Sequence, residues 1–507
     1  FFGRCAVDLM GVLHGRGVPP AGTSISLLSM MMLSLLCILA VVASAVSAFQ
    51  PESAHRRPTV GHRNENRPNS NKICSPLGES AQRRSTVGYR KQICSPLAAY
   101  VDISENVYRD VASMDEWATA CGVQKADGFQ LTSEEGPLGL DFSVMTTVDM
   151  AEGSPVVFVS NEMIFASNQI EQELGPYAQE AVGILRRLSG DEDFELRHIQ
   201  SHFYLFLKIL MEYEKGDQSP WFSWLNSLPR TYYNGASMTP FCYECLPPLM
   251  GSLAMGERVK FINFCQAVKK ADFISEETTK NIHNNEVVKW AFQIATTRSF
   301  EGDDNVSRIV PLGDYFDHSA NAEVAMNFDE EGNCVAYTTM DVRAGSPLRI
   351  SYCDSTNPSY IFARYGFLDE SSPATFCKIM IPNVSSELVD MGYDFSRMLF
   401  YKDGQVSEEV WDVLLYQYLS DGNVGVRRQL YEAHMNGDID TKRAIHSEYY
   451  PQTLEALRNH VDDFLGQLDE LSAKGEGKSV AEHPRLPMIL QHNDFVRQTF
   501  LAVKATL

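Results

Sequence analysis

Short runs of apolar and β-branched residues occur along the middle of the chain, at 308–312, 324–328, 334–338 and 348–352. Each run is bounded by turn-forming residues, which is typical of strands. The second and third runs flank the acidic segment 329–333 and predict a hairpin. The first run is predicted to be a strand that leads into a polar loop. Residues 360–365 have helical character, so this region is predicted to be mostly β with one short helix.

The C-terminal third has a different period, with apolar residues recurring every three or four positions. A β-rich connection at 376–381 precedes it, and residues 473–484, rich in Gly, Lys and Glu, predict a mobile loop between its last helices. This part is therefore predicted to be a helical domain. The two clearest sets of helical positions are Val410, Trp411, Leu414, Leu415 and Tyr418, and Leu454, Leu457, Val461, Phe464, Leu468 and Leu471.

Composition and charge narrow the possible partners. The chain has 507 residues, 44% hydrophobic and 21% charged, which suits two or three globular domains with proper cores. Residues 1–100 contain 11 Lys or Arg and 4 Asp or Glu, so the remainder contains 32 basic and 61 acidic residues, a net charge of −29. Such a body repels phosphate groups, and we expect no nucleic acid partner.

The first hundred residues read as a targeting leader. An apolar run at 30–46 followed by Ala-Val-Ser-Ala at 45–48 predicts a signal peptide with an upstream segment over 1–48, with a signal anchor as the alternative. Ala48-Phe49-Gln50-Pro51 resembles the junction of the bipartite plastid presequences of algae with red secondary plastids. Residues 49–97, basic and internally duplicated, then predict a disordered transit peptide. We expect a plastid stromal protein with no membrane segment in its mature form; the alternative is the secretory pathway.

The cysteines indicate reduced core residues. Seven lie after the leader and are scattered through the sequence. Cys242 and Cys245 form one close pair without a second Cys or His pair at metal spacing, so no metal site is expected.

Four motifs follow in fixed order over about seventy residues. They are Arg298-Ser299-Phe300, Gly313-Asp314-Tyr315-Phe316-Asp317-His318-Ser319, Ile350-Ser351-Tyr352 and Tyr365-Gly366-Phe367. A purely structural interpretation exists for each piece: a tyrosine that ends a strand usually packs, and Arg298 could pair with Asp303 or Asp304. A hydrolase triad does not fit 317–319, because adjacent residues cannot face one another as a triad requires.

The order of these motifs resembles the SET-domain protein methyltransferases, in the branch of the Rubisco large-subunit lysine methyltransferases and the actin histidine methyltransferases. Upstream, 135–140 and 149–153 are similar to the opening hairpin and first turn of a SET domain, and the resemblance runs from 131 to the C-terminus. It implies an α+β chain. The expected parts are a SET-domain β-clip fold at 98–170 and 291–372, a helical insertion at 171–290, and an all-helical substrate-binding domain at 373–507.

The resemblance also implies functional residues. Tyr352 and Tyr365 correspond to catalytic tyrosines, and Phe300 corresponds to an aromatic in the acceptor channel of lysine-directed members. The cofactor would be S-adenosyl-L-methionine, bound by Glu135, Gly136, Leu138, Arg298, Asp314, Asp317 and His318. The sequence departs from the family where Asp317 replaces Asn, where Ser346 replaces Glu, and where Pro137 appears as an insertion.

Methyl transfer to an amine requires alignment and an unprotonated acceptor. Since a lysine has a pKa of about 10.4, neutralising it at pH 7 costs about 3–4 kcal/mol unless an apolar channel favours the neutral form. We expect a protein-lysine N-methyltransferase that docks its protein substrate on the helical domain and is a monomer. One alternative is a protein-histidine methyltransferase, and another is a non-catalytic SET-fold docking protein.

Overall fold

The computed structural model describes residues 99–507 except 106, 137–138, 191–192, 271–279, 303, 305, 354–357, 377–384, 394–397 and 421. The predicted leader, Leu138 and Asp303 lie outside the described residues, as do most of the connection at 376–381.

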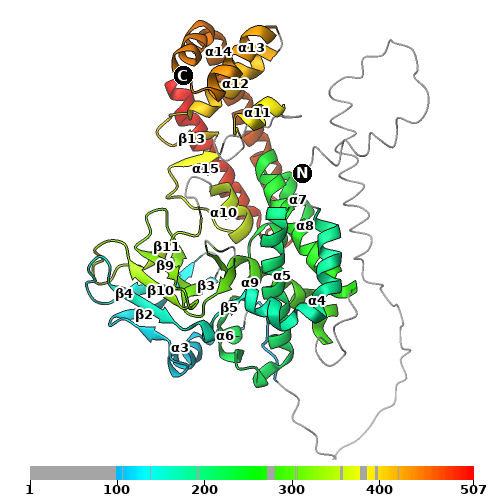
Figure 1. Cartoon of the computed structure of the whole chain (residues 1–507), viewed down its shortest axis with the longest axis vertical. Coiled ribbons are helices and arrows are strands. Elements are labelled where there is room, and N and C mark those ends of the chain that lie inside the picture. The colour runs from blue at the N-terminus through cyan, green and yellow to red at the C-terminus, as the bar shows by residue number, and fades with distance from the viewer. Residues whose placement is uncertain are drawn as a thin grey trace, which may run out of the picture. The chain divides into compact units, whose positions relative to one another are not determined.

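Small antiparallel sheets make up the β part (Figure 1). The largest has the order β1-β4-β10-β9, β2 and β3 form a hairpin, and β5-β7-β6 form a third sheet. Strands β8 and β11, which belong to the second and third motifs, form a parallel pair. The strands and the helix that precedes them are α3 Val111–Ala120, β1 Gln124–Lys125, β2 Phe129–Gly136, β3 Gly139–Thr146, β4 Pro155–Val159, β5 Phe165–Ala166, β6 Phe300–Glu301, β7 Ser307–Ile309, β8 Asp317–His318, β9 Val324–Phe328, β10 Cys334–Thr338 and β11 Arg349–Ile350.

One short helix, η1, precedes β5, and the other helices of this part lie between β5 and β6. Figure 1 shows α4, α5 and α8 side by side. The most buried of the group is α9, whose apolar residues enter the same core as the strands. These elements are η1 Asn161–Met163, α4 Ser167–Ser189, α5 Asp193–Glu214, η2 Gly216–Gln218, α6 Phe222–Ser227, η3 Gly235–Ser237, α7 Pro240–Glu244, α8 Pro248–Lys270, η4 Lys280–His283 and α9 Asn285–Thr297.

The C-terminal part is mostly helical, with one short antiparallel strand pair, β12 with β13, and it has its own core, formed mainly by apolar residues of α12, α13, α14 and α15 together with Phe400 of β13. Phe400, Phe464 and Phe500 stack at its centre, with ring centroids 4.5 and 4.6 Å apart for the pairs that include Phe500. The elements from η5 onward that complete the chain are η5 Gly313–Tyr315, α10 Pro358–Tyr365, β12 Ala374–Phe376, α11 Ser386–Asp390, β13 Leu399–Tyr401, α12 Glu408–Ser420, α13 Val424–Met435, α14 Ile439–Gly475 and α15 Leu486–Thr506.

Several predicted elements are confirmed and others need correction. The hairpin 324–328 with 334–338 is present at the predicted bounds, with Cys334 opposite Phe328. The strand expected at 308–312 is shorter, because Leu312 has a φ of 68° and turns the chain into η5. The strand expected at 348–352 has only two paired residues, since its partner β8 is equally short.

The loop predicted at 473–484 begins later than expected, because α14 continues to Gly475. The segment is also fastened to the helical insertion. Lys474 forms an ion pair with Glu244 at 2.8 Å, and His483 Nδ1 lies 2.9 Å from Thr239 Oγ1. The loop was predicted from its Gly, Lys and Glu content, which does not show these contacts with residues distant in the sequence.

Candidate active site

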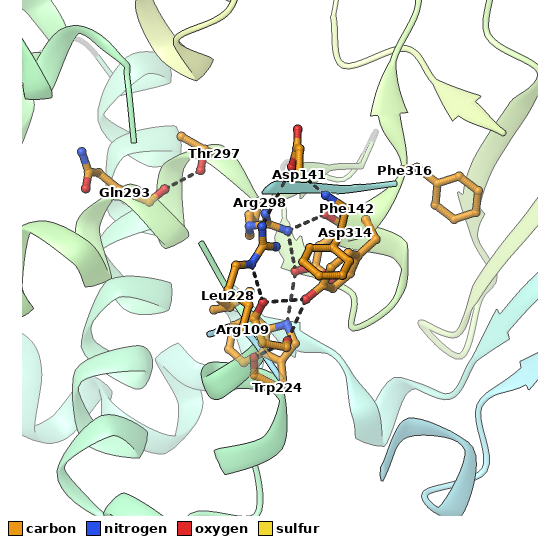
Figure 2. Close-up of polar contacts among 12 residues, drawn as sticks. Arg109, Asp141, Phe142, Trp224, Leu228, Gln293, Thr297, Arg298, Asp314 and Phe316 are labelled. Atoms are coloured by element: carbon orange, nitrogen blue, oxygen red, sulfur yellow. Dashed lines mark hydrogen bonds and ion pairs between the residues drawn. The ribbon is translucent and has the colours of Figure 1, made fainter. Parts of the chain in front are cut away.

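A buried ion pair joins two of the four motifs (Figure 2). Arg298 caps the C-terminus of α9, and its Nη1 donates to the backbone carbonyl of Asp314 at 2.7 Å and to Oδ2 at 3.2 Å. Trp224 Nε1 donates to the same Oδ2 at 3.2 Å. Burial raises the pKa of Asp314, and the ion pair with Arg298 only partly offsets it. The strained Leu312 precedes the turn that carries Asp314, as is common where a functional side chain must be aimed.

A second, largely buried arginine, Arg109, lies beside this pair, and sequence analysis did not identify it. Its Nε donates to the Ser227 carbonyl at 2.9 Å, and its Nη1 lies 3.9 Å from Asp141 Oδ1. The guanidinium also lies over the Phe142 ring, 4.8 Å from the centroid. Arg109 stands just before α3, outside every motif, so only the fold brings it next to Arg298.

Three polar atoms of this cluster are buried and have no hydrogen-bond partner among the described residues. They are Arg109 Nη2, Arg298 Nε and Asp314 Oδ1. An unpartnered buried polar atom costs about 1–3 kcal/mol, and more when it is charged. Two guanidinium donors suit an anionic group of a ligand, and the carboxylate oxygen suits a cationic one. The cluster therefore fits a ligand that carries both charges, such as the amino-acid end of a small molecule.

Asp317 occupies β8 near this cluster. Burial raises its pKa to about 7, and the negative charges of Asp141 and Glu134 act in the same direction, against Arg298 and Arg349. Arg349 lies opposite Asp317 in the parallel register but forms its ion pair with Glu323. Asp317 is thus a half-protonated carboxyl near pH 7.

His318 connects the same strand to Tyr352. Its Nδ1 accepts from the backbone N–H of Tyr352 at 3.1 Å, so its proton is on Nε2, which lies 3.3 Å from Asp369 Oδ2. Burial lowers the pKa of His318, and Asp369 partly opposes that. A neutral histidine of fixed tautomer therefore holds the backbone at Tyr352.

Aromatic rings gather around Tyr352. The ring centroids of Tyr352 and Tyr365 are 4.9 Å apart, and that of Phe367 lies 6.2 Å from each. The Tyr352 hydroxyl donates to the Phe316 carbonyl at 2.7 Å. Burial raises the pKa of Tyr352 well above its usual value and that of Tyr365 to about 12. Both tyrosines are neutral at physiological pH, so neither serves as a phenolate base, and the rings form an apolar wall.

Three other predicted site residues, Phe300, Glu135 and Gly136, lie apart from the charged cluster and the aromatic rings. Phe300 lies in β6, half-buried and opposite Arg308, and in the described part of the chain no ring contact joins it to Tyr352 or Tyr365. Glu135 and Gly136 end β2 at the tip of the β2–β3 hairpin, where Glu135 pairs with Leu140.

No metal or membrane feature accompanies the site. Where the chain is described, three or more His, Cys, Asp or Glu side chains do not come together in an arrangement that could hold a metal ion. Among the same residues, no helix combines the length and apolar character that a membrane crossing requires. The cysteines Cys242 and Cys245 are both buried and free.

Comparison with known proteins gives structural matches alone. No model of a known protein family matches the chain, and no curated protein matches it. Among solved structures, the SET domain of LSMT bound to lysine and AdoHcy has a TM-score of 0.53 at 14% identity, covering 79% of this chain and 91% of that one. Rubisco LSMT bound to sinefungin and monomethyllysine also has a TM-score of 0.53 at 14% identity, with 79% and 92% covered.

A third structure, Rubisco LSMT bound to AdoMet, has a TM-score of 0.52 at 14% identity, with 79% and 92% covered. These matches confirm the predicted fold class: an α+β chain with the SET-domain fold, a helical insertion and a helical C-terminal part.

Proposed function

We propose that this chain is an S-adenosyl-L-methionine-dependent protein-lysine N-methyltransferase of the SET-domain type, in the branch of the Rubisco large-subunit enzymes. The observation that carries the proposal is the cluster of unpartnered buried atoms at Arg109, Arg298 and Asp314 on this fold. Solved structures of that fold hold AdoMet or AdoHcy. The cofactor's methionine end has the carboxylate and ammonium that the cluster lacks.

The residues of the chain have separate tasks in this scheme. Arg298 and Arg109 would hold the cofactor's carboxylate, and Asp314 or Asp317 would accept from its ammonium. Glu135, Gly136 and Leu138 of the opening loop and His318 would contribute to the same pocket. When bound, the cofactor supplies an electrophilic methyl group on a sulfonium.

Alignment and desolvation are the catalytic contributions of the aromatic cluster. Tyr352, held by His318 and by the Phe316 carbonyl, would form one wall of the reaction line together with its ring neighbours Tyr365 and Phe367. Because both tyrosines stay neutral, the amine must lose its proton before or on entering the site. An apolar wall favours the neutral amine over the ammonium.

The resemblance at Phe300 supports a lysine acceptor over a histidine acceptor, while in the described structure no ring contact joins Phe300 to Tyr352 or Tyr365. An imidazole acceptor needs a hydrogen bond to fix its tautomer, and a phenyl ring in the acceptor channel cannot supply one. Two of the matching structures of this fold hold lysine or monomethyllysine. Histidine remains the second candidate acceptor.

The proposal also covers the protein substrate, the compartment and the oligomeric state of the enzyme. The helical C-terminal part, which has its own core, would dock a protein substrate. The leader would direct the chain to the plastid stroma, and the mature enzyme would act as a monomer. The acidic body of the protein suits a substrate segment that carries basic residues.

The test is transfer of labelled methyl from S-adenosyl-L-methionine by the purified full chain into soluble plastid extract. Wild type is compared with Tyr352→Phe and with Tyr177→Phe, a matched control on an exposed tyrosine of α4. We expect a labelled protein whose modified residue, read by mass spectrometry, is lysine. Tyr352→Phe should lose about 10²-fold or more of the rate, because the hydroxyl that fixes the geometry is gone.

Other outcomes select the alternatives. Methyl-histidine in the labelled protein would replace the acceptor and leave the chemistry in place. Absence of transfer by a folded wild-type protein that also fails to bind S-adenosyl-L-methionine would contradict the enzyme proposal and favour the docking protein. That alternative rests on Asp317 and Ser346, where the chain departs from the family.

A further inference from the structure

Arg364, which no motif includes, is a buried charge directly behind the aromatic cluster. It is the next-to-last residue of α10, is 6% exposed, and immediately precedes Tyr365. Its guanidinium lies 5.7 Å from the centroid of the Tyr365 ring. That ring in turn faces Tyr352 at 4.9 Å, so the charge is separated from the proposed acceptor channel by one ring.

The partners of Arg364 are neutral. Its Nε donates to the Thr296 carbonyl at 2.9 Å, Nη2 donates to His202 Nε2 at 2.9 Å, and Nη1 donates to the Tyr360 hydroxyl at 2.5 Å and more weakly to His198 Nε2 at 3.4 Å. Among the described residues, no carboxylate forms an ion pair with it. A buried cation without a paired anion is costly to keep.

Both histidines that face Arg364 are uncharged. His202 Nε2 accepts from Arg364 and cannot also carry a proton there, and burial lowers its pKa well below the usual value. His198 Nε2 likewise accepts, and its Nδ1 lies 3.0 Å from Glu301 Oε1. Protonation of either ring would place a second cation against the guanidinium.

The nearest carboxylates only partly offset the charge. Glu301 of β6 is separated from Arg364 by the His198 ring, and its side chain is 38% exposed, so water screens it. Glu257 of α8 is paired with Lys260 at 2.9 Å and contributes little net charge. The other titratable groups nearby are Tyr360, Tyr365 and Cys353.

We propose that Arg364 is a positioning residue that also lowers the proton affinity of the acceptor lysine, because its uncompensated charge behind Tyr365 opposes a second positive charge in the channel. The inference rests on the proposed function. A unit charge about 10 Å away in a partly screened interior changes a proton affinity by about tenfold, or about one pH unit. Arg364 would thereby reduce the free-energy cost of deprotonating the lysine, adding to the reduction that the apolar wall provides.

The experiment measures kcat and KM of the full chain from pH 6.5 to 10. It uses saturating S-adenosyl-L-methionine and a peptide cut from the acceptor protein recovered in the transfer assay. The pH limb of kcat reports the amine in the complex, whereas that of kcat/KM reports the free amine. For Arg364→Gln we expect the kcat limb to move up by about one unit. At pH 7.5, kcat and KM should then fall together by up to about tenfold while kcat/KM is nearly unchanged.

Two further variants separate charge from structure. Arg364→Lys keeps the charge and should keep the wild-type limb. Arg497→Gln removes an exposed arginine of α15 that pairs with Asp469, and it should not shift the limb. A purely structural role for Arg364 predicts instead a loss of kcat/KM with an unmoved kcat limb, and that result would overturn the inference.

If Arg364→Gln does not fold, Glu301→Gln decides. Removal of the Glu301 carboxylate, which partly offsets the charge, should move the kcat limb down by a few tenths of a unit, and an unmoved limb would overturn the inference. These failures are distinct from failure of the proposed function, because that failure is the absence of transfer by wild type.

Discussion

Two buried aspartates, Asp314 in the SET part and Asp412 in the helical part, differ in how many of their carboxylate oxygens have hydrogen-bond partners. Asp314 has Arg298 and Trp224 on one oxygen and no described partner on the other. Asp412, in α12, has both oxygens occupied: Oδ1 lies 2.6 Å from His446 Nε2, and Oδ2 accepts from Lys442 Nζ at 2.6 Å and from the Tyr393 hydroxyl.

The pKa values follow the same division. Burial raises the pKa of Asp314, and its partners do not fully offset that. Burial also acts to raise the pKa of Asp412, but the hydrogen bonds from His446, Lys442 and Tyr393 outweigh it and lower the pKa. A carboxylate that is satisfied within the fold is a structural element, whereas one left half satisfied on a strained turn is prepared for a ligand.

The largest effect, on the free energy of unfolding, is expected from substitution of Asp412, whose carboxylate has partners on both oxygens. Asp412→Asn leaves Lys442 and His446 without their anion, so the free energy of unfolding at pH 7 should fall by about 3 kcal/mol. Affinity for S-adenosyl-L-methionine should stay at the wild-type value. Urea unfolding followed by circular dichroism measures the free energy of unfolding, and calorimetric titration measures the affinity.

The control is Asp440→Asn, which changes the exposed side chain of an i,i+3 pair with Arg443 and should change stability little. A loss below about 1 kcal/mol for Asp412→Asn would show that the lobe does not depend on this network.

Asp314→Asn should give the converse result. The amide keeps the shape but not the charge, so affinity for S-adenosyl-L-methionine should fall about 10- to 100-fold, as expected for loss of a charge-assisted hydrogen bond. The free energy of unfolding without cofactor should change less than in Asp412→Asn, because Arg298 retains the Asp314 backbone carbonyl. Asp469→Asn on the exposed face of α14 is the control for charge alone. Unaltered affinity would mean that Asp314 is as purely structural as Asp412.

The smallest effect, a change in the free energy of unfolding, is expected from substitution of Asp317. Burial raises its pKa to about 7, so the folded protein still holds this proton at pH 5.5, where the unfolded chain has lost it. Stability from this group therefore declines as the pH rises from about 4 to 7 and stays low above 7. Asp317→Asn removes the decline. The variant should gain about 1–2 kcal/mol over wild type at pH 8.5, and less at pH 5.5, in thermal unfolding without cofactor. Equal gains at both pH values would contradict a raised pKa.

How far the site could be predicted depends on where its residues lie in the sequence. Arg298, Asp314, Asp317, His318, Tyr352 and Tyr365 stand in motifs of fixed order, and the structure brings them into two adjoining groups. Arg109 and Arg364 carry no motif. A single arginine before a helix, or within one, reads as an ordinary surface residue, because most arginines are exposed.

Local sequence pattern alone determined the type of several elements of this protein. The two short apolar runs that flank the acidic turn at 329–333 predicted a hairpin, and the helical spacing at 410–418 and 454–471 predicted α12 and α14. These patterns depend on local backbone geometry and on which side of an element is buried. The tertiary structure alone decided which charges are compensated. Burial and the approach of side chains distant in sequence leave one Asp314 oxygen without a partner among the described residues. They also occupy both oxygens of Asp412 and surround Arg364 with hydrogen-bond partners that are not carboxylates. Compensation depends on distances between elements, and no local pattern contains them.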